Sequence, residues 1–337
     1  MKILRHQAYA RAGLIGNPSD GYNGKTISVI VRNYRAQVTL YEWDRIEIVR
    51  SRNDESSFRS LDELSEDVRR HGYYGGIRLV KAAIHGFADY CRARSISLHD
   101  RNFSIRYEST IPRQVGLAGS SAIIVATFRA LLDFYGITID RRVLPSLVLS
   151  VERDQLGIQA GLQDRVIQVY GDAVFMDFSK EAMEICDGFP CGRYESIPTE
   201  LFPPLYIAHS ADYSEPTEVF HNNLRFRYDN GEPDVLEAMR IFAALAVEAR
   251  QAIESGRRER LAELMDENFD TRRSICRLAK EQVAMVETAR AVGVSAKFAG
   301  SGGAIIGTYP DEATFDRLVA AMKGIGCTVI KPILDER

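Results

Sequence analysis

Hydrophobic and polar residues follow a strand-like pattern in the first third of the chain and a mostly helical one after it. β-branched or alternating runs predict strands over Thr26–Val31, Ala36–Tyr41, Ile46–Val49 and Phe103–Ser109. The polar stretch Ser51–Ser60 predicts a loop. Apolar residues at helical spacing predict helices over Gly72–Arg92, Ser120–Tyr135 and about Arg142–Arg153. The first half therefore combines a sheet with several helices.

The second half has its own set of elements. Strands are predicted at Asp172–Phe178, Leu205–Ser210 and Thr328–Ile330, with a strand–glycine loop–strand unit at Lys297–Tyr309. Helices are predicted at Pro233–Gly256, Arg258–Ala291 and Phe315–Lys323. The Gly- and Pro-rich segment Asp187–Pro204 marks a junction, which divides the chain into domains 1–185 and 186–337. Because regular βαβ alternation is missing from the pattern, we expect an α+β fold with two lobes.

Composition narrows the class of protein. The 337 residues are 45% hydrophobic and 26% charged, with a net charge of -3, as in ordinary soluble globular proteins. This acidic balance disfavours a nucleic-acid partner. The five cysteines are scattered and the six histidines show no metal-ligand spacing, which favours a reducing compartment, and we expect a cytoplasmic protein. No stretch predicts a signal peptide or a membrane span.

The segment Ile111–Ala122 is the strongest chemical motif. Gly116 and Gly119 allow backbone conformations that turn amides toward one point, and Ser120 and Ser121 then open a helix. The first amides of a helix lack internal partners, so a helix start behind a glycine loop is a natural phosphate site. It is not a Walker A loop, because no lysine follows the glycine. The alternative is a turn that Ser120 caps for stability alone.

Two further glycine segments carry weaker signals. In Gly157–Arg165, glycines place Asp164 beside a helix start, where a carboxylate suits an acceptor for a hydroxyl proton. The alternative is a helix-terminal acid without a catalytic role. In Lys297–Gly307, glycines joining two strands allow a ligand or another backbone to come close, and a simple tight hairpin is the alternative.

Together the three segments resemble the GHMP superfamily of small-molecule kinases. The phosphate loop of that family reads Pro-x-x-x-Gly-Leu-Gly-Ser-Ser-Ala, and Pro112–Ala122 matches it except that Ala118-Gly119 stands in place of the single middle glycine. The opening motif of the family is similar to Ala8–Asp20, with Asn17-Pro18 in place of its Glu-His pair. The run Arg11–Tyr22 most resembles the glucuronokinase branch.

The resemblance implies ATP and Mg²⁺ as cofactors and a site between the lobes. It implies an N-terminal lobe of the ribosomal-protein type with a left-handed βαβ unit, and a ferredoxin-like C-terminal lobe. Asp164 matches the catalytic aspartate and Arg11 a basic residue near the transferred phosphoryl group. The nucleotide-binding positions it implies are Pro112, Gln114, Gly116, Leu117, Ala118, Gly119, Ser120 and Ser121. The magnesium positions are Ser121 and Glu152, and the substrate positions are Asp20, Asn17, Tyr22 and Gly302.

The implied reaction is transfer of the γ-phosphoryl group of ATP to a hydroxyl of a sugar or sugar acid such as glucuronate, by a monomer or homodimer. A sugar-acid carboxylate needs a cation, and Lys25, Arg113 and Arg225 are the candidates. Two alternatives stay open. In the first, the fold is the same and the acceptor is a mevalonate-type alcohol or a heptose phosphate. In the second, the chain is a non-catalytic sensor that binds ATP and a metabolite.

Overall fold

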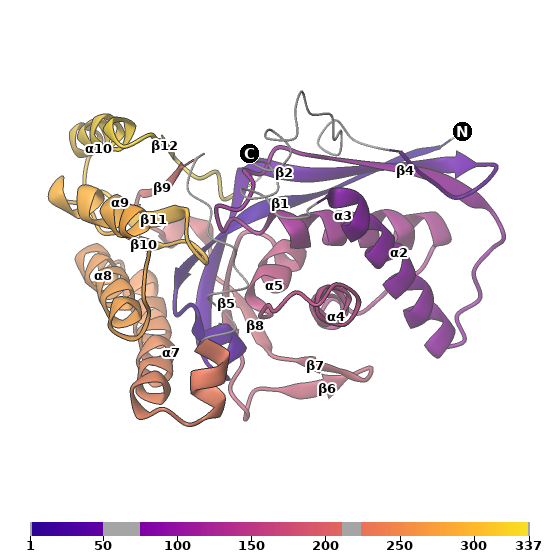
Figure 1. The fold of residues 1–337 in the computed structure, drawn as a ribbon, viewed down its shortest axis with the longest axis horizontal. Helices are drawn as coiled ribbons and strands as arrows, with labels where there is room; N and C mark the ends of the chain where they lie inside the picture. Colours follow the sequence, from indigo (N-terminus) through magenta and orange to yellow (C-terminus); the bar gives the residue numbers. More distant parts are fainter. Residues whose placement is uncertain (1, 50–74, 211–223, 336–337) are drawn as a thin grey trace, which may run out of the picture.

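The protein has two lobes, each built on an antiparallel sheet covered by helices (Figure 1). Its structure is a computed structural model that describes residues 2–49, 75–210 and 224–335. One lobe holds a sheet of six strands and the other a sheet of four, and a separate hairpin joins β6 (Glu184–Cys186) to β7 (Phe189–Cys191). The predicted α+β, two-lobed architecture is confirmed.

The larger sheet is organised around β2 (Lys25–Trp43), which has 19 residues. β1 (Ile3–Ile15) pairs with β2 along nearly its whole length, and β5 (Ala173–Asp177) and β4 (Asn102–Ser109) pair with residues 25–29 and 36–43 of it. The outer strands are β1, β3 (Glu47–Val49), which is parallel to β4, and β8 (Arg193–Ser196), which is antiparallel to β5. The long central strand thus connects the outer edge of the N-terminal lobe to its boundary with the second lobe.

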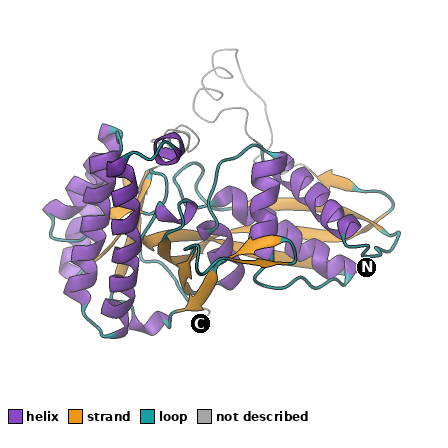
Figure 2. Cartoon of the chain, turned by 90° about the horizontal axis from the view of Figure 1, so that it is seen from below, coloured by secondary structure: helices purple, strands orange, loops and turns teal. Residues whose placement is uncertain are grey.

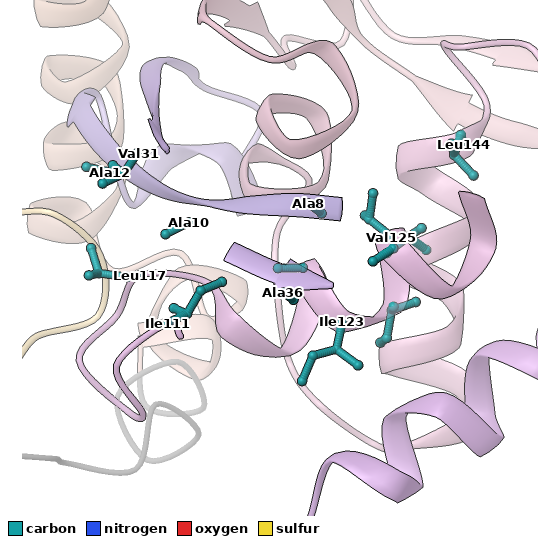
Figure 3. Packing of buried hydrophobic residues seen from close by; sticks show 14 of the residues in the cluster. Ala8, Ala10, Ala12, Val31, Ala36, Ile111, Leu117, Ile123, Val125 and Leu144 are labelled. Atoms are coloured by element: carbon teal, nitrogen blue, oxygen red, sulfur yellow. The ribbon is translucent and has the colours of Figure 1, made fainter. Parts of the chain in front are cut away.

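Small side chains on β1 let a helix pack closely on this sheet. Ala8, Ala10 and Ala12 are fully buried, and α3 (Gly119–Tyr135) packs against β1 and β2. Figure 3 shows these alanines in the same core as Ile123 and Val125 of α3. This packing fixes the start of α3, where the predicted phosphate loop ends. The helices packed around α3 are α2 (Gly76–Ala93), α4 (Leu144–Ser150) and α5 (Gln163–Tyr170).

The C-terminal lobe has the strand order β10-β11-β9-β12. Its strands are β9 (Leu205–Ser210), β10 (Lys297–Phe298), β11 (Ala304–Thr308) and β12 (Cys327–Ile330). Its helices are α7 (Pro233–Glu254), α8 (Arg258–Ile275), α9 (Lys280–Ala291) and α10 (Glu312–Gly324). Figure 2 shows helices gathered at this end of the molecule, with the long strands extending toward the other. Helix α7 packs against β2, so the lobes share an interface.

Several predicted elements differ from those observed. The runs Thr26–Val31 and Ala36–Tyr41 are parts of one strand, β2, and β1 was not predicted, because its alanines do not stand out as apolar. The predicted helix Arg258–Ala291 is two helices, separated by residues 276–279. The predicted helix Arg142–Arg153 is α4 followed by the π-helical turn Val151–Gln155.

The predicted junction lies in a structured segment. Within residues 187–204, β8 pairs with β5 of the six-stranded sheet. The boundary at residue 186 stays a prediction. The expected loop Ser51–Ser60 and residues 72–74 of the first predicted helix lie outside the described residues. Across the described ranges, no helix has the length and apolar character needed to span a bilayer.

Candidate active site

The loop between β4 and α3 has the strained backbone of a ligand-binding turn. Gln114, Gly116 and Ala118 all adopt positive φ angles, of 57°, 73° and 62°. For Gln114 and Ala118 this is an unfavourable region, because the Cβ atom approaches the following carbonyl. Strain of this kind persists at functional sites where the surrounding structure enforces it. Pro112 precedes the strained positions, and Leu117 is buried beneath them.

Helix α3 begins at Gly119 without the predicted serine cap. Ala118 occupies the N-cap position, and its side chain has no oxygen that could accept from an amide. The hydrogen bond from Ala122 N to Ala118 O, at 3.2 Å, starts the helix. The amides of Gly119, Ser120 and Ser121 therefore belong to the part of a helix that has no internal acceptors. This arrangement favours an anion site over a turn that serves stability alone.

A second glycine loop, between β10 and β11, lies directly against the first. A Cβ atom on Gly300 would come within 2.2 Å of Gly116 O, and one on Gly116 within 2.8 Å of Gly302 O. Only glycine allows this approach. Arg272 of α8 holds the loop by donating to Gly300 O at 2.7 Å and to Ser301 O at 2.8 Å. The segment is a tight antiparallel hairpin of β10 and β11, as the alternative expected, and its loop also lies against the phosphate loop.

Arg11 of β1 connects the two glycine loops to Asp164. Its Nη1 donates to Gly116 O at 2.6 Å and to Ala299 O at 3.0 Å. Its Nε donates to Asp164 Oδ1 at 2.6 Å. One buried guanidinium therefore touches all three predicted glycine segments, the second of them through the predicted catalytic acid, and its most distant partner, Ala299, is 288 residues away in sequence.

Asp164 lies in the first turn of α5 and next to a second, more deeply buried ion pair. The following residue, Arg165, donates to Glu152 Oε2 through Nε at 2.5 Å and also contacts that oxygen through Nη2. Arg165 Nη1 lies 3.5 Å from Asp164 Oδ2. Burial raises the pKa of Glu152, and the neighbouring Arg165 opposes this rise. Two arginines and two carboxylates thus alternate along this edge of the site.

Asp20 is placed beside Asp164 by a short 3-10 turn, Ser19–Gly21. Its Oδ2 accepts from Gln163 N at 3.4 Å, and a Cβ on Gly161 would come within 2.0 Å of the same oxygen. The loop before α5 is therefore shaped around this carboxylate. Burial, with repulsion from Asp164, raises the pKa of Asp20 from 3.8 to about 6. A carboxylate of this kind is a strong acceptor for a hydroxyl group.

Asn17 is held by the other lobe. Its Oδ1 accepts from Lys297 Nζ at 2.6 Å, and its backbone carbonyl accepts from Asn268 Nδ2 at 3.1 Å. Lys297 is buried and also donates to Gly13 O and Phe298 O. Burial, with repulsion from Arg272 and Arg11, holds the pKa of Lys297 well below its ordinary value. These bonds anchor the segment before Asp20, and a direct substrate contact by Asn17 stays a prediction.

The other two predicted substrate positions lie on different sides. Tyr22 is buried, packs on Tyr228 with ring centroids 4.8 Å apart, and has a pKa that burial raises to about 12. Gly302 lies beside the phosphate loop, and a Cβ there would meet the Gln282 side chain within 2.5 Å. The structure thus brings Tyr22 close to Asp20, and Gly302 close to Gly116. Their contacts with substrate stay predictions.

The magnesium positions supply oxygen atoms of the right kind. The Ser121 hydroxyl donates to Ala118 O at 3.2 Å at the start of α3. Both contacts of Glu152 with Arg165 involve Oε2, so Oε1 is outside that ion pair. Mg²⁺ prefers oxygen ligands and typically combines one or two carboxylates with substrate phosphates. In the described ranges, no three His, Cys, Asp or Glu side chains form a metal-binding group, so the nucleotide would have to complete the shell.

Arg165, Arg272 and Lys297 belong to the site but were not predicted from the sequence to have a role in it. A signal for Arg165 was present, because a cation in the first turn of a helix opposes the helix dipole unless a carboxylate balances it. Arg272 and Lys297 gave no such signal. Their partners include carbonyls of other segments, Gly300 O for Arg272 and Gly13 O for Lys297, which no local pattern reveals.

Comparisons with known proteins identify the family of the chain. The family model "GHMP kinases N terminal domain" matches residues 78–172, and "GHMP kinases C terminal" matches residues 249–326. Glucuronokinase 1 of Arabidopsis thaliana is 42% identical over 315 residues, covering 91% of this chain and 85% of that protein. Probable glucuronokinase 2 of the same plant is 43% identical over 317 residues, covering 92% and 85%.

A solved structure shows that the fold of this chain is shared with a known kinase. Lactococcus lactis galactokinase, solved in complex with galactose, superposes with a TM-score of 0.79 at 17% identity, covering 99% of this chain and 94% of that one. The galactokinase therefore shows a shared fold, while the plant relatives and the two family models show kinship. An ATP-dependent kinase site is consistent with all of them. The chain belongs to the GHMP kinase family.

Proposed function

We propose that this kinase transfers the γ-phosphoryl group of ATP to the anomeric hydroxyl of a sugar acid, with glucuronate as the first candidate. The observation that carries this proposal is the position of Arg11, which donates to the phosphate loop at Gly116 O and to Asp164 Oδ1, both at 2.6 Å. The phosphate-binding turn and a carboxylate that can receive a proton therefore both accept hydrogen bonds from Arg11. The 42% identity to a glucuronokinase supports the choice of acceptor.

Each residue has a defined task in this reaction. Backbone amides at the start of α3 bind the β- and γ-phosphates, and Arg11 adds a fixed positive charge next to them. Asp164 orients the attacking hydroxyl and takes its proton, and Asp20 accepts a hydrogen bond from a second hydroxyl. An anomeric hydroxyl is more acidic than an ordinary alcohol, so this base needs only modest strength.

Mg²⁺ is part of the proposal. When bound, it neutralises charge on the phosphate oxygens. Ser121 and Glu152 would hold it together with the nucleotide. Arg165 fixes the orientation of the Glu152 carboxylate through Oε2, which leaves Oε1 for the metal.

The compartment, the oligomeric state and the partners of the enzyme can be proposed as well. We propose a cytoplasmic protein that acts as a monomer or homodimer and binds no nucleic acid or membrane. Size-exclusion chromatography with light scattering measures the oligomeric state directly.

The test is an acceptor panel assayed for ADP release. Glucuronate, galacturonate, glucose, galactose, mevalonate and a heptose 7-phosphate are compared with ATP and Mg²⁺ present. We expect the highest kcat/KM with a uronate and an acid-labile product whose phosphorus couples to the anomeric proton in NMR. Preferred turnover of mevalonate or the heptose phosphate would redirect the assignment within the family. ATP binding without ADP release from any acceptor would instead indicate a sensor.

A further inference from the structure

The acceptor side of the site is unfavourable for an anion as the described side chains stand. Asp20 Oδ2 accepts from the amide of Gln163, the residue before Asp164, and the two carboxylates repel each other, so each raises the energy of a further negative charge nearby. A uronate carries such a charge at neutral pH. If the enzyme accepts uronates, as the proposed function states, a cation near Asp20 has to bind the carboxylate.

Most cations near the site are already engaged with other groups. Arg11 pairs with Asp164, and Arg165 pairs with Glu152. Lys25, one of the three cations that the sequence suggested, donates to Asp177 at 2.6 Å. Arg113, the second, is exposed on the phosphate loop and so belongs to the nucleotide side.

Of the three candidates that the sequence suggested, Arg225 is the one that contacts the turn carrying Asp20. Its Nη2 donates to Gly21 O at 2.5 Å, and Gly21 directly follows Asp20 in the same 3-10 turn. The guanidinium therefore contacts the backbone of the short turn that also carries Asp20.

The guanidinium of Arg225 is also fixed in orientation. It lies over the Tyr22 ring at 4.4 Å from the centroid, with Tyr228 at 6.0 Å. Stacking on an aromatic face restricts the plane of an arginine and is stronger than for a lysine. The two tyrosines pack on each other, so the platform beneath the cation belongs to a buried cluster.

The remaining donors of Arg225 are suited to a carboxylate. Within the described ranges, Gly21 O is its hydrogen-bond acceptor, and its ion-pair partner, Asp229, is 3.8 Å away at Nη1, too far for a hydrogen bond. The side chain is 46% exposed. A guanidinium binds a carboxylate best through two parallel N–H donors, and this orientation leaves such donors accessible.

We propose that Arg225 is the specificity-determining residue that binds the carboxylate of a uronate substrate, with Asp20 and Asp164 binding the hydroxyls. This inference rests on the proposed function. It explains how a site with two substrate-facing carboxylates accepts an anionic sugar.

The test compares Arg225→Gln, Arg225→Lys and a matched control, Arg227→Gln. Arg227 lies in the same segment, but Glu232 at 2.6 Å and Asp234 at 2.7 Å already neutralise it. For Arg225→Gln we expect a rise in the uronate KM of about 10- to 100-fold, as for the loss of charge-assisted hydrogen bonds. The KM values for ATP and for neutral sugars should stay within about twofold of wild type. The lysine variant should recover part of the loss, and Arg227→Gln should keep the wild-type ratio of uronate to neutral sugar.

Direct binding separates this inference from the proposed function. Calorimetry with glucuronate and glucose measures each affinity without turnover. Loss of uronate preference in Arg225→Gln alone supports the inference even if the wild type releases no ADP, which would reject only the proposed function. An unchanged uronate affinity in Arg225→Gln, or equal losses for glucuronate and glucose, would overturn the role of Arg225.

Discussion

The candidate active site contains two neighbouring carboxylate–arginine pairs, and the two pairs differ in burial. The pair between Arg11 and Asp164 leaves the aspartate side chain 19% exposed, whereas the Glu152 side chain in its pair with Arg165 is only 1% exposed. Arg11 also donates to two carbonyls, so it does not depend on Asp164 alone. The same chemistry thus gives an acid that can meet a substrate in one place and a buried, fixed acid in the other.

The largest expected effect comes from the less buried pair, Arg11 and Asp164. Asp164→Asn should lower kcat by about 10²–10⁴-fold, because the variant cannot take the hydroxyl proton. ATP binding should persist, because the start of α3 is unchanged. Steady-state kinetics and nucleotide binding measure the two properties on the same preparation. A folded variant with wild-type kcat would show that Asp164 is not the base.

The buried pair should matter more for stability. Glu152→Gln removes the carboxylate nearest to the buried Arg165 charge and leaves it Gly161 O and the more distant Asp164 carboxylate. Breaking a buried ion pair typically costs about 3–5 kcal/mol of the free energy of unfolding. The loss should be clearly smaller for Asp164→Asn, since Arg11 keeps its carbonyl partners. Urea unfolding measures both, and the double variant Glu152→Gln with Arg165→Met serves as the control that removes the Arg165 charge as well. Equal losses in the two single variants would erase the distinction between the pairs.

A smaller effect concerns Asp20 and pH. Because its pKa is raised from 3.8 to about 6, the folded state holds this proton more tightly than the unfolded state. The stabilising contribution of protonated Asp20 is therefore complete below pH 3.8 and is lost as pH rises through about 6. Relative to Asp20→Asn, the wild type should lose about 1–3 kcal/mol of stability across this window. A stability difference independent of pH would show that Asp20 is not perturbed.

The smallest effect is expected at Ala118, which stands with Gly119 where the family phosphate loop has a single glycine. Ala118→Gly relieves left-handed strain of about 1–2 kcal/mol, while a freer unfolded chain opposes this by about 0.4–1 kcal/mol. The net gain should stay within about 1 kcal/mol, with the ATP KM changed less than threefold. Ala118→Val is the control and should destabilise, because a β-branched residue disfavours this backbone. Matching results for both variants would mean that φ at 118 is not strained.

The sequence predicted best the features that depend on local pattern. The helix at Ser120–Tyr135, the strand Leu205–Ser210 and the strand–glycine–strand unit from Lys297 all appear within a few residues of their predicted positions. Strand β1 was not predicted because alanine is only weakly apolar, although three alanines in this strand are fully buried. The break between α8 and α9 escaped because both helices keep the same apolar spacing across it.

The site was predictable in its parts and less so in its connections. The glycine motifs located the phosphate loop and Asp164, and the resemblance supplied their roles. No sequence pattern indicated that Arg272 holds the second loop or that Arg225 stacks on Tyr22, because each contact joins segments far apart in the chain. Such contacts depend on how the lobes pack.

The bonds from Lys297 and Asn268 to the segment around Asn17 have a thermodynamic consequence. Separating the C-terminal lobe from residues 13–17 would take the buried Lys297 side chain away from Gly13 O and Asn17 Oδ1 and break the bond from Asn268 Nδ2 to Asn17 O. The loss of these bonds is costly enough to couple the melting of both halves. The chain should therefore denature in one cooperative calorimetric transition, in spite of its two separate sheets.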